Sequence, residues 1–159
     1  MKLSAPLVPL CIGLALGACQ TIPTFTPQQL EARRSMQEQI AQEPKGPYFV
    51  GRRYYKNDYK MWGYIRKPGE SWSDARLVML NENQTLAPDR AANAIGSDNG
   101  FEYRLYGHFS GETVYEPASN EFYPEFVLKR AELLTNAPAP IFLSPRALDP
   151  NERYYPSPF

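Results

Sequence analysis

The sequence is poor in the residues that build metal centres, disulfide frameworks and histidine-based catalytic sites. Its 159 residues include two cysteines and one histidine, which excludes zinc ribbons and multiple disulfides. Lysine plus arginine and aspartate plus glutamate occur in equal numbers, 17 of each, so overall charge does not drive binding to nucleic acid. The sequence also contains no glycine-rich phosphate loop. These absences remove several enzyme and nucleic-acid-binding classes from consideration.

The chain also lacks a hydrophobic run long enough to cross a membrane. Residues 3–16 are mostly apolar and contain Pro6 and Pro9, whereas a membrane helix needs about 20 apolar residues. Lys2 is the only charged residue before Glu31. A short apolar segment that follows one positive charge and ends in small residues is typical of an export signal.

A cysteine ends this signal-like segment, in the sequence Leu16-Gly17-Ala18-Cys19. The motif resembles the lipobox of bacterial lipoproteins. The resemblance implies cleavage before Cys19, a diacylglyceryl thioether on its sulfur and a third acyl chain on the new amino terminus. Several acyl chains anchor a protein stably, since each buried methylene contributes about 0.8 kcal/mol. Gln20 stands where the retention signal of inner-membrane lipoproteins usually has Asp, which points to the outer membrane.

The composition divides the chain into four parts. These are a signal peptide (1–18), a lipid-anchored linker and helix (19–47), a small β-barrel domain (48–136) and a proline-rich tail (137–159). Thr26, Pro27 and Gln29 predict a helix start with Thr26 as N-cap. The apolar stripe of this helix is thin, so we expect a solvated stalk. Six prolines in the tail predict a segment without strands or helical turns, either extended along the barrel or mobile.

Five short strands are predicted between the linker and the tail. Short apolar segments, which alternate in 59–66 and 101–109 and are apolar on both faces in 75–80, place them at 59–66, 75–80, 101–109, 113–115 and 122–134. Gly63 predicts a bulge or bend, Gly111 a break, and the long connection has room for a short helix around residues 90–94. The order and spacing loosely resemble an OB-fold, which implies a mainly all-β fold built as a small five-stranded Greek-key barrel. An SH3-like barrel is the nearest alternative.

Basic and aromatic residues are concentrated at the start of the predicted barrel. Seven basic residues and one acid lie between residues 45 and 68, with tyrosines and tryptophans interleaved. This mixture suits phosphate groups, lipid headgroups or sugar rings. The candidate contact residues are Arg52, Arg53, Lys56, Lys60, Trp62, Tyr64 and Trp72. Residues 82–125 hold eight acids and two bases, so the two blocks can instead pair with each other, within one molecule or between molecules.

Catalytic candidates are few. His108 and Ser110 lie two residues apart on a predicted strand and therefore share a face, but their surroundings do not match the G-x-S-x-G motif. Two pairs of carboxylates, Glu112 with Glu116 and Glu121 with Glu125, are the candidates for glycoside hydrolysis. We expect no catalytic residue, metal or cofactor.

The sequence therefore predicts a membrane-anchored, non-catalytic lipoprotein of the bacterial cell envelope, at the outer membrane and facing the periplasm. It is expected to act as a binding or scaffolding module for an anionic envelope component or a protein, and nucleic acid is not an expected partner. Two alternatives stay open: a cell-wall or polysaccharide hydrolase, and a structural envelope protein that self-associates through its charge blocks.

Overall fold

The computed structural model describes residues 25–159, so the predicted signal peptide and Cys19 lie outside the described residues. The elements follow in the order α1 (Pro27–Ala41), β1 (Phe49–Arg53), β2 (Gly63–Arg66), β3 (Arg76–Asn81), α2 (Pro88–Ala91), β4 (Glu102–Glu116) and β5 (Glu121–Thr135). Two short 3-10 helices lie at Trp72–Asp74 and Pro145–Leu148. Within the described part of the chain, no helix combines the length and the apolar character of a membrane span.

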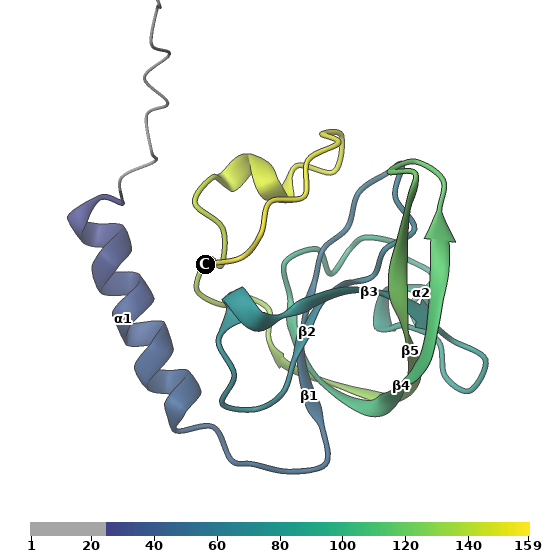
Figure 1. Cartoon of the computed structure of the whole chain (residues 1–159), viewed down its shortest axis with the longest axis horizontal. Coiled ribbons are helices and arrows are strands. Elements are labelled where there is room, and N and C mark those ends of the chain that lie inside the picture. The colour runs from purple at the N-terminus through teal and green to yellow at the C-terminus, as the bar shows by residue number, and fades with distance from the viewer. Residues whose placement is uncertain (1–24) are drawn as a thin grey trace, which may run out of the picture.

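The strands close into one barrel in the order β1-β2-β3-β5-β4, and β4 pairs back onto β1 (Figure 1). Neighbouring strands are antiparallel except β3 and β5, which run parallel. This topology confirms the predicted small all-β barrel of five strands and is consistent with the OB-like resemblance.

The individual strands differ from the predicted ones at two places. The alternation of apolar residues predicts no strand at Phe49–Arg53, where β1 lies, because its second half consists of two arginines. The predicted strands at 101–109 and 113–115 are one strand, β4, because a register irregularity between Phe109 and Thr113 absorbs Gly111 without ending the pairing with β5. The predicted number of strands is right, although one strand was missing and another was split.

The barrel interior is filled with apolar side chains. Every strand contributes to it, through Phe49, Ile65, Val78, Leu105, Phe126 and Leu128. Gly51 of β1 also faces inward, and a Cβ added there would come within 2.4 Å of the Leu105 side chain. The interior is therefore a packed core in which even one methyl group would be too many.

Helix α1 lies beside the barrel and begins as predicted (Figure 1). The Gln29 amide donates to the Thr26 hydroxyl, and the Gln29 side chain accepts from the Thr26 amide, which completes a capping box. The second half of the helix buries Met36 and Ile40 in a cluster shared with the barrel and the tail. The helix is therefore docked at this end and is not solvated along its whole length.

The tail, residues 137–159, packs between α1 and the barrel (Figure 1, yellow). Ile141 and Phe142 are buried in the same cluster as Met36 and Ile40. The expectation that the tail forms no helical turn is wrong, because Pro145–Leu148 is a 3-10 helix. Pro145 is the first residue of this helix, where the missing N–H of proline leaves no hydrogen bond unmade. The tail forms no strand, as expected.

Candidate functional site

The alternation of β1 separates two of the predicted contact residues. Arg52 points outward, toward the tail and α1, whereas Arg53 points into one end of the barrel. Of the seven candidates, Lys60 alone is exposed; Arg52, Arg53, Lys56, Trp62, Tyr64 and Trp72 are each at most 6% exposed. The predicted basic and aromatic residues therefore do not form an open surface patch.

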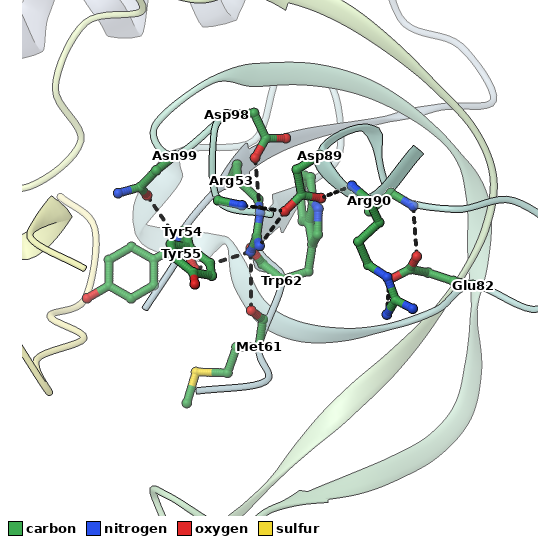
Figure 2. Close-up of polar contacts among 12 residues, drawn as sticks. Arg53, Tyr54, Tyr55, Met61, Trp62, Glu82, Asp89, Arg90, Asp98 and Asn99 are labelled. Carbon is green, nitrogen blue, oxygen red and sulfur yellow. Dashed lines mark hydrogen bonds and ion pairs between the residues drawn. The ribbon is translucent and has the colours of Figure 1, made fainter. Parts of the chain in front are cut away.

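The Arg53 guanidinium is the centre of a buried polar cluster (Figure 2). It donates to Asp89 Oδ2 at 3.0 Å and to the Trp62 carbonyl at 2.5 Å, and its Nε lies 3.3 Å from Asp98 Oδ1. Tyr103 donates its hydroxyl proton to Asp98 at 3.0 Å. This cluster ties the end of β1 to α2 and to the loop that leads into β4.

The pKa values of the two carboxylates around Arg53 are shifted in opposite directions. Burial raises the pKa of Asp89, but the hydrogen bond from the Gly96 amide and the charge of Arg53 together outweigh it, so the pKa lies below its ordinary value. Burial raises the pKa of Asp98 above its ordinary value, and the charge of Arg53 only partly offsets this effect. Arg53 and the Gly96 amide together favour the charged form of Asp89, whereas Arg53 only partly offsets the burial of Asp98. We call Arg53, Asp89 and Asp98 the buried ionic pin, because they join β1, α2 and the loop before β4.

Outside the barrel, Trp72 is held between two arginines. The guanidinium of Arg66 lies 4.5 Å from a ring centroid of Trp72 and that of Arg52 lies 5.1 Å away. Arg52 forms an ion pair with Glu102 at 2.6 Å, and Arg66 forms one with Glu43 at 2.5 Å. The outward-facing arginines are therefore neutralised within the molecule.

The same outer surface of the barrel holds the tail. Its side chains donate hydrogen bonds to main-chain carbonyls of the tail: Arg52 to Ala139 at 3.0 Å, Lys56 to Asp149 at 2.6 Å, Tyr64 to Pro156 at 2.8 Å, and Tyr54 to Tyr154. We name this surface the tail face and define it by Arg52, Tyr54, Lys56, Tyr59, Tyr64 and Trp72. Three of the seven predicted contact residues, Arg52, Lys56 and Tyr64, thus bind a segment of their own chain.

Aromatic contacts complete the tail face. The Phe142 ring packs against Tyr54 and Tyr64, with ring centroids 5.4 Å and 5.6 Å away. The Tyr155 ring meets Tyr59 edge to face at 5.4 Å. Residues of the tail therefore contact the tail face through rings as well as carbonyls.

The pattern of charge and aromatic residues found part of this site and missed the rest. Tyr54 and Tyr59 were not among the candidates, although they belong to the same interleaved segment. The tail was expected to extend along the barrel or to be mobile, but it was not connected with the basic and aromatic residues. The signal for the occupant is compositional: the tail is rich in proline, which favours an extended chain that offers carbonyls.

The two charge blocks pair with each other within the molecule. Arg52 meets Glu102, and Arg53 meets Asp89 and Asp98. For these residues the structure favours intramolecular pairing over a binding patch or contacts between molecules.

The structure places His108, Ser110 and Glu116, three of the predicted catalytic candidates, as follows. His108 and Ser110 are both exposed on β4, and no hydrogen bond joins them in the described structure. Glu116 is fully buried and accepts from the Ser119 and Ala118 amides at 2.7 Å and 3.2 Å, so it shapes the turn between β4 and β5. Among residues 25–159, no three histidine, cysteine or acidic side chains are grouped to hold a metal ion.

Comparisons of this chain with models of known families, with curated proteins and with solved structures find no match.

Proposed function

We propose that the chain is a membrane-anchored, non-catalytic binding or scaffolding module of a bacterial cell envelope. Cys19, acylated after cleavage of residues 1–18, attaches it to the outer membrane, and the barrel faces the periplasm. The lipobox-like sequence Leu16-Gly17-Ala18-Cys19 supports the anchor.

One observation carries the binding role: the tail face holds a polypeptide segment that belongs to no strand of the barrel. Four of its side chains donate to main-chain carbonyls, and its rings pack against Phe142 and Tyr155. Hydrogen bonds to carbonyls combined with aromatic packing are the means by which many modules recognise proline-rich segments.

Helix α1 connects the proposed anchor to the barrel. It begins at Pro27, eight residues after Cys19, and the chain enters the barrel only after this helix has ended (Figure 1). Because Met36 and Ile40 pack against the barrel and the tail, the helix is part of the folded module that the anchor holds at the membrane.

Cross-linking in the native envelope tests this function. A photoreactive amino acid replaces Lys60, which is exposed beside the tail face, or His108, which is exposed on β4, as a matched control. We expect Lys60 to yield an adduct with an envelope protein, and His108 to yield none. Cys19→Ser should abolish the adduct because the chain is no longer anchored. The function is contradicted if no adduct forms, or if mass spectrometry finds residues 1–18 still attached and no acyl group.

A further inference from the structure

We propose that the tail face is the binding site for an extended, proline-containing, acidic segment of a partner protein, and that the tail occupies this site while the partner is absent. This inference rests on the proposed function and names the class of partner and its built-in competitor.

The hydrogen bonds of the tail face do not depend on the side chains of the occupant. Arg52, Lys56 and Tyr64 each donate to a main-chain carbonyl of the tail. A segment from another protein that presents carbonyls at the same places can take these bonds without a matching side chain at every position.

Prolines in the tail explain which kind of segment fits. Ala139 and Asp149 each precede a proline, and a residue before proline is held in an extended conformation. Proline itself has no N–H to satisfy, and the tail-face side chains named above act only as donors toward the tail. A proline-containing segment is therefore matched to a surface that supplies donors.

Lys56 shows where a partner can bind better than the tail does. The Lys56 residue is 2% exposed and its ammonium group donates to the Asp149 carbonyl, but within the described residues it forms no ion pair. The Asp149 carboxylate accepts from the Asn151 amide at 2.9 Å instead. Burial lowers the pKa of Lys56, and only the more distant charges of Asp149 and Glu152 oppose this effect. A partner that places a carboxylate on Lys56 would add an ion pair that the tail lacks.

The tail is also an imperfect occupant of its site. A cavity of about 400 Å³ remains between the tail, α1 and the barrel, lined by residues that include Ala32, Arg52, Gly100, Pro140 and Leu143. The tail adds no strand to the barrel, so its release breaks no hydrogen bond between strands. Segments held by few backbone bonds open more readily than the core of a domain.

A competition experiment with the chain's own tail sequence as probe tests the inference. A fluorescent synthetic peptide of residues 145–159 is titrated into the full chain in detergent. The receptors are the wild type and Tyr155→Ala, which weakens the docked tail by removing the ring that meets Tyr59. We expect the peptide to bind Tyr155→Ala at least fivefold more tightly than the wild type. A peptide that itself carries Tyr155→Ala should bind at least fivefold more weakly, whereas Ser157→Ala, at an exposed position, should bind within twofold of the unchanged peptide.

A second test does not depend on Tyr155→Ala and uses an engineered disulfide, the staple, between the barrel and the tail. The Asn57 side chain donates to Asn151 at 2.8 Å, so Asn57→Cys with Asn151→Cys places two thiols on opposite sides of the contact between barrel and tail. The oxidised protein should bind the peptide at least tenfold more weakly than the same protein after reduction.

Three outcomes would overturn the inference: no binding of the peptide to any receptor, equal binding to the oxidised and reduced staple, or a concentration-dependent dimer of Tyr155→Ala without peptide. The last result would assign the site to the tail of a second copy. Because this assay uses purified components, its failure is distinct from a failure of the proposed function, which the cross-linking from Lys60 reports.

Discussion

The buried ionic pin at the end of the barrel makes Arg53→Met the most informative stability variant. The side chains of Arg53, Asp89 and Asp98 are 7%, 1% and 5% exposed. The methionine fills similar volume but leaves two carboxylates buried without their cation. Removal of one partner from a buried ion pair costs about 3–5 kcal/mol, a large part of the roughly 5–15 kcal/mol that stabilises a typical domain.

The dependence on pH follows from the direction of the Asp89 shift. In the wild type the folded-state pKa of Asp89 lies below its ordinary value, so its ionised form adds stability above that value, and this stability is lost as the pH falls through the folded-state pKa. In Arg53→Met the hydrogen bonds from the Gly96 and Arg90 amides remain while the cation is gone, so the pKa of Asp89 rises relative to the wild type. The pKa of Asp98, which burial already raises, rises further. Relative to the wild type the variant therefore loses stability as the pH rises, and the difference between the two proteins is largest near neutral pH.

Chemical denaturation at pH 7 and pH 4.5 measures both effects. Arg90→Met is the matched control, because Arg90 is next to Asp89 in sequence but its side chain is 55% exposed and pairs with Glu82 at the surface; this variant should lose less than about 1 kcal/mol. Adding Asp89→Asn to Arg53→Met should restore part of the loss. The reasoning is refuted if Arg53→Met costs less than about 1 kcal/mol at pH 7, or if its cost does not change with pH.

Three further substitutions test other parts of the fold by chemical denaturation. Gly63→Ala should cost about 3 kcal/mol of stability or prevent folding, because the new Cβ would lie 2.1 Å from the Arg52 carbonyl oxygen. A cost below about 1 kcal/mol would show that β1 and β2 move apart at this point with little loss of stability. Glu116→Gln should cost about 1.5–3 kcal/mol of stability, since the amides that donate to the carboxylate lose a charged acceptor. Hydrogen bonds, first of all from Ser119, outweigh burial and lower the pKa of Glu116. The difference in stability from the wild type should therefore shrink as the pH falls through that pKa, and a constant difference would contradict this. Thr26→Ala should cost about 1 kcal/mol through the lost cap, and an unchanged midpoint would show that the capping box is unimportant.

Local features of the fold were predictable from the sequence. Thr26 and Gln29 are three residues apart, and the cap they form needs nothing beyond the first turn of the helix. Strand β3 was found from its continuous apolar run, and the first half of β4 was found from its alternation. The two faces of β3 contact different clusters, since Val78 lies in the barrel core and Met79 packs against the cluster of Tyr59, so the pattern of the sequence matches the pattern of burial.

The site was only partly predictable because it depends on contacts between distant residues. Arg52 and Arg53 are adjacent and chemically identical, yet the pleat of β1 sends one toward the tail and the other into the barrel. Their partners are 50 and 36 residues away, at Glu102 and Asp89. A count of charges along the chain identifies such a segment but cannot show that it is buried. The occupant of the tail face was equally hidden, since proline content predicts an extended tail without showing where it lies.

Hydrogen exchange at the Asn57 amide tests most directly whether the tail is bound to the barrel in solution. This amide belongs to the barrel and donates to the Pro150 carbonyl of the tail at 2.9 Å. The Phe159 amide, which donates to the Ile141 carbonyl within the tail at 3.1 Å, reports whether the tail keeps its own fold. The Asn57 amide should exchange at least about tenfold more slowly than in an unfolded peptide, which corresponds to an opening free energy of about 1.4 kcal/mol or more. Exchange of the Asn57 amide at the unfolded rate would show that the tail is not held, and that the tail face has no occupant within its own chain.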